Sequence, residues 1–187
     1  MSRLWLATLL CGTGLAQTPP ELQRAFESAE RQILRLSPSA FPKLPKEVLA
    51  DLKRRGCLIP QVPHGNESHN VIKGQFAKPG QTDWAILCSI EGVSSILVYW
   101  KGSAANPAQI EEMDDIVRLQ DSGADGMVYS REIASVGRAY ILQHYQAYGG
   151  TKPPPIDHQG INDAFVEKGS VVFYFYGGKW LQLTGAD

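Results

Sequence analysis

The stretch SVVFYFYGGKWLQL, residues 170–183, decides the fold because it predicts the clearest hairpin in the chain. The segments Ser170–Tyr176 and Lys179–Leu183 are rich in β-branched and aromatic residues, and Gly177-Gly178 joins them. A two-residue loop of this kind requires the two strands to run antiparallel. We therefore expect an antiparallel sheet at the end of the chain.

Three further β-branched and aromatic runs precede the hairpin and predict strands at residues 70–76, 83–89 and 94–100. The run 94–100 carries apolar side chains on both of its faces, since Leu97 and Tyr99 alternate with Ile96 and Val98. Both faces of such a strand must be covered, which suits a sheet with helices on one side.

Four segments predict helices: one that follows the capping sequence Thr18-Pro19-Pro20-Glu21 and runs to about Leu36, one from Pro45 to Arg55, a short one at 104–113 and one at 138–148. In the first helix the apolar residues form one stripe, which packs on its own domain or docks on a partner. The fold class expected is α+β, an antiparallel β-sheet with helices packed on one face.

Composition excludes two classes of partner. The 187 residues include 18 Lys and Arg against 19 Asp and Glu, a formal net charge of −1. This balance gives no electrostatic basis for binding nucleic acid. No segment after the N-terminus is long and apolar enough to predict a membrane span.

The N-terminal residues 1–16 have the pattern of a secretory signal peptide. Arg3 precedes an apolar run, and Gly14-Leu15-Ala16 offers a small-x-small cleavage site. A membrane anchor or buried strand and a lipid anchor on Cys11 are the alternatives, but the apolar run is too short to cross a bilayer. Cleavage would leave a periplasmic or secreted single domain at 17–187, with an N-terminal helix and linker at 17–44.

Cleavage would also remove one of the three cysteines and leave Cys57 and Cys88. In an oxidising compartment this pair predicts a disulfide bond, which would stabilise the fold by roughly 3–4 kcal/mol. The alternative is two separate buried thiols.

Oxygen-bearing residues surround a glycine between residues 157 and 163 and make a candidate calcium site from Asp157, Asn162 and Asp163. The loop lacks the glutamate that would complete an EF-hand, because Lys168 stands in that place. A tight turn after three prolines is the simpler interpretation, so no cofactor is expected.

Two other candidate surfaces follow from residue type. Tyr174, Tyr176 and Trp180 flank the glycine turn and would form an exposed platform for a saccharide or protein partner, unless a helix covers them. A hydrolase site is the second possibility, gathered from polar residues spread along the chain: His69, Asp83, His144, Asp157, His158 and Asp163. His144, His158 and Asp163 are its catalytic candidates.

Residues 74–87, which begin with Gly74-Gln75-Phe76 and include Asp83, resemble one strand-loop-strand unit of FG-GAP repeats. Such repeats commonly hold calcium, but residues without carboxylates occupy the other loop positions here, so we expect a unit without metal. As a whole the chain resembles secreted bacterial proteins of uncharacterised function. Three segments carry that resemblance: Arg55–Gln61, Asp83–Cys88 and Ser170–Leu183.

The sequence does not identify a reaction. The leading hypothesis is an exported, disulfide-stabilised binding or structural module, because no nucleophile motif and no complete set of metal ligands is evident. The alternative is a secreted hydrolase with a His/Asp site. The two differ in whether His144, His158 and Asp163 converge in one pocket.

Overall fold

The computed structural model describes residues 20–63, 68–123 and 126–187. Its helices are α1 (Pro20–Gln32), α2 (Lys46–Arg54) and α3 (Arg138–Tyr148), with short 3-10 turns η1 (Pro38–Ala40), η2 (Trp100–Gly102) and η3 (Asp115–Arg118). Its strands are β1 (Arg35–Leu36), β2 (Ile59–Pro60), β3 (Val71–Gly74), β4 (Asp83–Ile90), β5 (Val93–Tyr99), β6 (Ala108–Asp114), β7 (Leu119–Asp121), β8 (Met127–Tyr129), β9 (Arg131–Val136), β10 (Gly160–Phe165), β11 (Gly169–Tyr176) and β12 (Lys179–Thr184). The predicted signal peptide and Cys11 lie outside the described residues.

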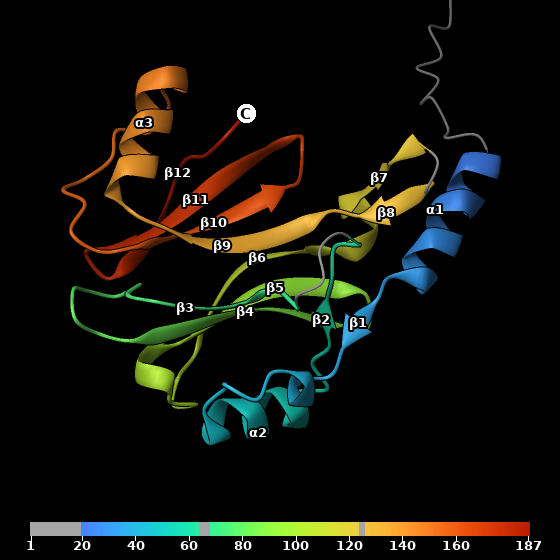
Figure 1. Ribbon diagram of the computed structural model, residues 1–187, viewed down its shortest axis with the longest axis horizontal. Helices are drawn as coiled ribbons and strands as arrows, with labels where there is room; N and C mark the ends of the chain where they lie inside the picture. Colours follow the sequence, from blue (N-terminus) through green and yellow to red (C-terminus); the bar gives the residue numbers. More distant parts are fainter. Residues whose placement is uncertain (1–19, 64–67, 124–125) are drawn as a thin grey trace, which may run out of the picture.

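Two four-stranded antiparallel sheets form the centre of the molecule. Strand order is β3-β4-β5-β6 in the first sheet and β12-β11-β10-β9 in the second. The sheets face each other, with α2 on the outer side of the first sheet and α3 on the outer side of the second (Figure 1). The predicted mixture of helices with antiparallel strands is confirmed, but the strands are divided between sheets and each outer face has its own helix.

The main core lies between the two sheets. Its buried apolar side chains come from the inner face of each sheet and from the β7–β8 hairpin: Phe76, Ala85, Leu87, Ile96, Val98 and Ile110 from the first sheet and its loop, Ile133, Ile161 and Phe173 from the second, and Leu119 and Tyr129. Because side chains alternate along a strand, the residues between these positions point outward toward the helices.

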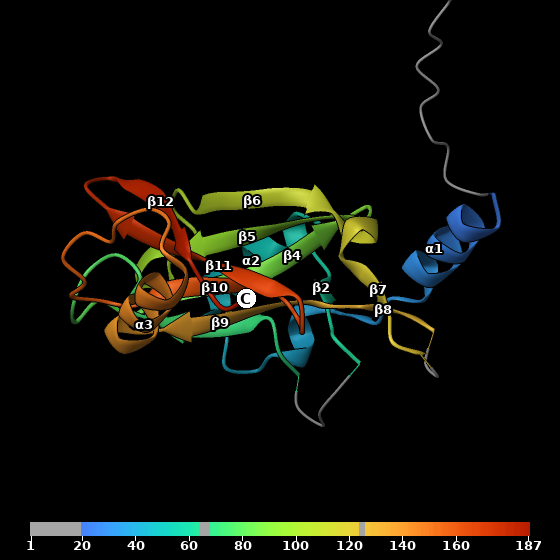
Figure 2. The same cartoon turned by 90° about the horizontal axis from the view of Figure 1, so that it is seen from above.

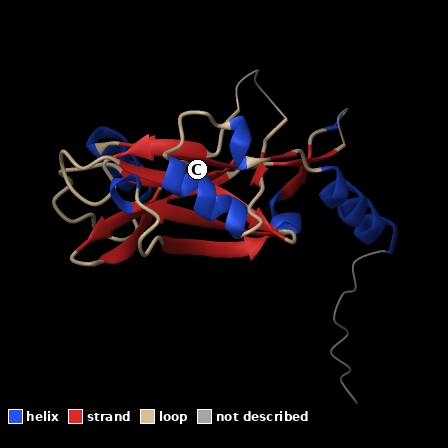
Figure 3. Cartoon of the chain, turned by 90° about the horizontal axis from the view of Figure 1, so that it is seen from below, coloured by secondary structure: helices blue, strands red, loops and turns tan. Residues whose placement is uncertain are grey.

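Two smaller cores lie under the helices. Helix α2 packs Val48 and Leu52 onto the outer face of the first sheet, where it lies across the strands when the molecule is seen from below (Figure 3). Helix α3 packs Ile141 against Val172 and Leu183 on the outer face of the second sheet. No helix in the described ranges has the length and apolar character needed to cross a bilayer.

The predicted disulfide bond is confirmed. Cys57 follows α2, and its Sγ is bonded to that of Cys88 in strand β4, with 5.4 Å between the two Cα atoms. Both residues are buried in the core under α2. The bond therefore joins the end of the helix to a strand of the first sheet.

Helix α1 projects from one end of the molecule, beside the β7–β8 hairpin (Figure 2). The predicted end of this helix was wrong, because α1 stops at Gln32 and Arg35–Leu36 form strand β1. Strand β1 pairs with β2, and the backbone N–H of Gln61 donates to the Leu34 carbonyl at 2.8 Å. These contacts between distant segments outweigh the apolar stripe that favours a longer helix.

The predicted helix at 104–113 was also wrong, because this segment contributes strand β6 at the edge of the first sheet. A bulge interrupts β6 between the pairs Ser94–Met113 and Ile96–Ile110. Glu111 lies in this bulge with φ 52°, a left-handed conformation that is strained for a residue with a side chain. The bulge turns the Glu111 carbonyl toward the space between the sheets, where it accepts a hydrogen bond from Arg131.

Candidate functional site

Strand β10 places two neighbouring polar residues on opposite faces of the second sheet. Ile161 belongs to the core between the sheets, so Asp163, two residues on, points the same way. Asn162 pairs with Val172, which belongs to the core under α3, and so points outward. The predicted turn at 157–163 thus includes a strand, and two of its three calcium candidates point in opposite directions.

Asp163 is bound to a buried arginine between the sheets. Arg131 Nε donates to Asp163 Oδ1 at 3.0 Å and its Nη2 to Oδ2 at 2.9 Å. The guanidinium also donates to the Ser94 carbonyl at 3.3 Å and the Glu111 carbonyl at 2.9 Å. Arg131 is 0% exposed and Asp163 1% exposed. The bidentate hydrogen bonding and the two additional carbonyl acceptors compensate for the cost of burying this charge pair.

A second carboxylate extends this polar region. Asp115, 0% exposed, accepts hydrogen bonds from Arg35, at 2.7 Å from Nη2, and from the hydroxyls of Ser89 and Ser94. We call the set Arg131, Asp163, Ser94, Asp115 and Arg35 the inter-sheet network. Its hydrogen-bonding groups are engaged with one another, so the network is structural.

The inter-sheet network also affects a neighbouring phenol. The Tyr129 hydroxyl lies 3.5 Å from Ser94 Oγ. Burial, and then the negative charge of Asp115, raise the pKa of the Tyr129 hydroxyl well above its ordinary range. The Tyr129 hydroxyl therefore stays protonated beside the inter-sheet network.

The structure does not bring the three catalytic candidates together. Asp163 lies between the sheets, whereas His144 lies on α3 beyond the opposite face of the second sheet. His158 stacks on Tyr174 in the core region under α3, and its two ring nitrogens each lie 3.0 Å from a backbone carbonyl oxygen, those of Gln159 and Phe175. A hydrolase site built on these three residues is therefore not formed.

The remaining hydrolase candidates also have structural partners. His69 Nε2 accepts a hydrogen bond from the Val62 amide at 2.7 Å. The Asp83 carboxylate accepts from the backbone amides of Phe76, Ala77 and Lys101, at 3.0, 3.0 and 2.9 Å. Gln81 Nε2 donates to the same carboxylate at 2.8 Å. In the segment that resembles an FG-GAP unit, N–H groups thus surround the carboxylate, and the predicted strand-turn-strand arrangement is confirmed by β3 and β4.

Asp51 on α2 is a fourth buried carboxylate with structural partners, after Asp163, Asp115 and Asp83. Arg55 Nε lies 2.6 Å from its Oδ2, the Tyr99 hydroxyl donates to the same oxygen at 2.9 Å, and Arg54 contacts Oδ1. Burial alone would raise the pKa of the Asp51 carboxyl, but the hydrogen bonds from Arg55 and Tyr99 outweigh it and lower that pKa.

The calcium candidates are dispersed. Asp157 has a side chain 67% exposed to solvent and accepts a hydrogen bond from the Tyr174 hydroxyl at 3.2 Å. Asn162 lies on the outer face of the second sheet, and Asp163 is bound to Arg131. Across residues 20–63, 68–123 and 126–187, no three His, Cys, Asp or Glu side chains are grouped as metal ligands.

The predicted aromatic platform is also divided. Tyr174 is 0% exposed in the core under α3, and Tyr176 is 45% exposed. Trp180 pairs with Phe175 on the inner face of the second sheet, where both rings contact Trp100 of η2 with centroid distances of 5.8 and 5.0 Å. The three predicted residues therefore do not share one surface, and Trp180 helps to hold the two sheets together.

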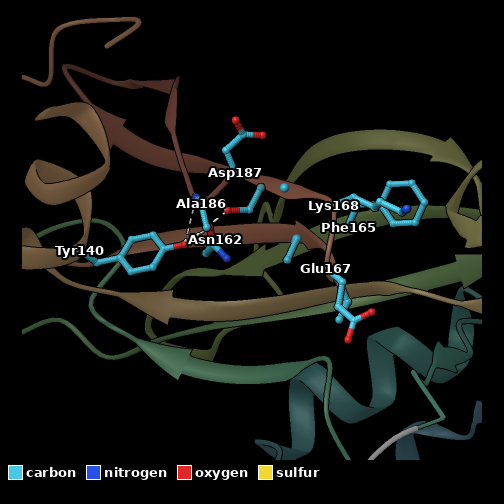
Figure 4. A pocket seen from close by; sticks show the side chains of 11 residues that line it. Tyr140, Asn162, Phe165, Glu167, Lys168, Ala186 and Asp187 are labelled. Carbon is cyan, nitrogen blue, oxygen red and sulfur yellow. Dashed lines mark hydrogen bonds between the residues drawn. The ribbon is translucent and has the colours of Figure 1, made fainter. Parts of the chain in front are cut away.

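A pocket opens on the outer face of the second sheet, beside the first turn of α3 (Figure 4). Its volume is about 220 Å³, and we call it the Tyr140 pocket. Three of its lining residues are Tyr140 on α3, Asn162 on β10 and Ser170 on β11. The rest of the lining comes from the β10–β11 turn and the last residues of the chain: Ala164, Phe165, Val166, Glu167, Lys168, Gly169, Ala186 and Asp187.

Hydrogen bonds hold the polar floor of the Tyr140 pocket in place. The Tyr140 hydroxyl donates to Asn162 Oδ1 at 3.2 Å and lies 3.4 Å from Ser170 Oγ. The Ala186 amide donates to both hydroxyls, at 3.3 and 2.8 Å. Asn162 is 8% exposed, yet its Nδ2 donates to no atom of the described residues.

Sequence reasoning missed Tyr140 and Ser170 as site residues. The local signal was weak, because Asn162 is followed by the polar residue Asp163 and Ser170 only begins the apolar and aromatic run of the hairpin. The pairing of β10 with β11 places Ser170 opposite Ala164, one step along the outer face from Asn162. That register was hidden because residues 157–163 were interpreted as a turn.

The geometry of the Tyr140 pocket suits binding rather than acid-base chemistry. Its floor offers an amide and two hydroxyls, while Lys168, Glu167 and Asp187 supply charge only at the rim. Comparison of the chain with known protein families, with curated proteins and with solved structures finds no match.

Proposed function

We propose that the protein is a disulfide-stabilised, non-catalytic binding module that works in the periplasm or outside the cell, with the Tyr140 pocket as its binding site. Its ligand would be a small polar group that accepts hydrogen bonds from the pocket floor. Such a function needs no general base and no metal ion.

The unpartnered amide of Asn162 carries this proposal. The fully buried side-chain N and O atoms without a partner in the described residues are Gln120 Oε1, Ser135 Oγ and Trp180 Nε1, so Asn162 Nδ2 is instead open to the pocket and available to a ligand. Asn162 Nδ2 has no described partner although the residue is 8% exposed, and it lies in the lining of an open pocket. A ligand oxygen at this point would satisfy the amide.

Two observations support the compartment. The first 16 residues have the pattern of a signal peptide, and the chain forms a Cys57–Cys88 disulfide bond, which oxidising compartments favour. The net charge of −1 gives no attraction to nucleic acid. Expression of the full chain in a bacterial host, followed by fractionation and N-terminal sequencing, tests export, and a cytosolic product that retains residues 1–16 would overturn it.

The binding proposal is tested by thermal shift against small polar compounds, namely sugars, amino acids, acetate and phosphate. At least one compound is expected to stabilise the wild-type protein, and the shift should disappear in the variant Asn162→Asp, which replaces the free donor by an acceptor. Gln182→Glu is the matched control, because it makes the same change at an exposed position of the same sheet.

Two results would overturn the proposed function. One is a ligand whose stabilising effect is unchanged in Asn162→Asp. The other is turnover of ester, amide or glycosidic substrates that is lost in His144→Ala or His158→Ala, since these residues have no catalytic role here.

A further inference from the structure

Resting on the proposed function, we infer that the ligand is a neutral oligosaccharide, with one terminal sugar in the Tyr140 pocket and the following units against the aromatic side chains of α3. The inference names the ligand class of the same site. It follows from the hydrogen-bonding groups on the pocket floor, the charges at its rim, its size and the surface that adjoins it.

The hydrogen-bonding groups on the pocket floor are complementary to a hydroxyl group of a ligand. Asn162 Nδ2 has N–H groups to donate, and the hydroxyls of Tyr140 and Ser170 each receive a hydrogen bond from the Ala186 amide. A hydroxyl both donates and accepts, as a sugar hydroxyl does. A neutral ligand rich in hydroxyls satisfies both kinds of group at once.

The charges around the pocket disfavour ions. Glu167 and Asp187 extend outward on different sides of the pocket, and Lys168 lies beyond them along the rim (Figure 4). An anion bound on the floor would be repelled by the two carboxylates, and a cation would meet the N–H groups of Asn162. Sugar hydroxyls have no net charge and hydrogen-bond to carboxylates and ammonium groups alike.

The size of the pocket indicates that most of a longer ligand lies outside it. Pockets that enclose drug-sized molecules have volumes of about 300–1,000 Å³. The Tyr140 pocket has about 220 Å³, so it holds one small ring or part of one. Affinity for a chain of sugars must then come from the neighbouring surface.

That surface is a row of aromatic rings along α3. Tyr140, His144 and Tyr148 are spaced four residues apart, so they lie on one side of the helix. The ring centroids of Tyr140 and His144 are 4.0 Å apart, and those of His144 and Tyr148 are 6.1 Å apart. His144 Nδ1 lies 2.8 Å from the Tyr140 carbonyl, which only accepts, so Nδ1 carries the proton and the ring orientation is fixed.

The row is open to solvent at its far end, where Tyr148 is 52% exposed. His144 stacks against one side of the Tyr148 ring, with 21° between the ring planes, so a sugar ring would contact the other face of Tyr148. A flat apolar ring with a polar edge suits the apolar faces and polar rims of sugar rings. The Tyr140 side chain belongs to both parts of the site, because its hydroxyl lies on the pocket floor and its ring begins the row.

The test uses the full exported chain and isothermal titration with neutral tetrasaccharides of glucose, xylose and N-acetylglucosamine, together with the corresponding monosaccharides. At least one tetrasaccharide should bind, and Asn162→Asp should weaken binding at least ten-fold. Tyr148→Ala should weaken the tetrasaccharide three- to ten-fold and leave the monosaccharide unchanged. Tyr176→Ala is the control, because Tyr176 is a comparably exposed tyrosine at the β11–β12 turn.

The outcomes separate this inference from the proposed function. If no saccharide binds but another compound stabilises the protein through Asn162, the inference is wrong and the binding module stands. If a saccharide binds and Tyr176→Ala weakens it while Tyr148→Ala does not, the row on α3 is wrong. If no compound of either panel binds, the proposed function fails as well.

Discussion

Asn162 and Asp163 are adjacent in strand β10, and they belong to two polar regions of different character. Asp163 lies in the inter-sheet network, where Arg131 binds both of its oxygens. Asn162 lies on the floor of the Tyr140 pocket, where its oxygen is bound and its nitrogen is not. The side-chain types are similar, and the alternation of the strand alone separates their roles.

The comparison shows that burial of a polar residue does not by itself indicate function. Asp163, Asp115 and Asp51 have the residue type of catalytic groups, but arginines, hydroxyls or both surround each of them. The informative residue is the one whose hydrogen-bonding capacity is only half used. On the floor of the Tyr140 pocket that residue is Asn162, a neutral amide.

Breaking the inter-sheet network should have the largest effect on the free energy of unfolding. Arg131→Met leaves the Asp163 carboxylate buried without its main partner, and we expect a loss of about 3–5 kcal/mol in the free energy of unfolding. Urea denaturation measures it. Arg131→Met/Asp163→Leu should recover most of the loss, because no fully buried charge is left unpaired; Arg118, which lies 3.8 Å from Asp163, keeps contact with solvent. A loss below about 1 kcal/mol in the single variant would contradict the structural role of the network.

The contribution of the buried Asp51 carboxylate to stability depends on pH. Because its pKa is lowered in the folded protein, the Asp51 carboxylate contributes stability above its ordinary pKa, and this contribution is lost as the pH falls through the folded-state value. Asp51→Asn should therefore cost about 1.5–3 kcal/mol at pH 7 and progressively less below about pH 4. Urea unfolding across this range measures both effects. Asn162→Ala, as the control, should not change the shape of the pH profile.

The pocket floor should contribute less to stability than the network. Tyr140→Phe removes the hydroxyl that donates to Asn162 and accepts from the Ala186 amide. We expect a loss of about 1 kcal/mol by thermal or urea unfolding, together with weaker ligand binding. A loss as large as that of Arg131→Met would mean that the pocket is part of the structural framework.

The smallest effect is expected at the exposed carboxylate. Asp157→Ala should change the free energy of unfolding by no more than about 0.5 kcal/mol, since its side chain is 67% exposed. Added calcium should leave the melting temperature of both proteins unchanged. Calcium-dependent stabilisation that Asp157→Ala abolishes would restore the predicted calcium loop.

Local sequence patterns correctly predicted the elements whose conformation depends mainly on their own residues. The hairpin at 170–183 follows from Gly177-Gly178 and its flanking residues, and α2 and α3 follow from their apolar spacing and glycine ends. The disulfide bond followed from counting cysteines outside the predicted leader. These signals lie within a few residues of one another or in the composition of the chain.

Features that depend on distant pairing were not predicted. Residues 108–114 include Gln109, Glu111 and Glu112, which favour helix, but the segment pairs with β5 as a strand with a bulge at Glu111 and Glu112. Strand β10 was hidden because Gly160 and Asn162 are also typical of turns. The Tyr140 pocket needs α3, β10, β11 and the last residues of the chain together, so no single segment of sequence indicates it.

The bulge at Glu111 has a consequence beyond its contact with Arg131. Strand β6 is at the edge of the first sheet, and an unbroken edge offers N–H and C=O groups on which a strand of another molecule can add. The bulge interrupts that row, and Glu111, Glu112 and Asp114 place negative charge along it. The same distortion that supplies a carbonyl to the interior thus disfavours the addition of a strand from another molecule at this edge.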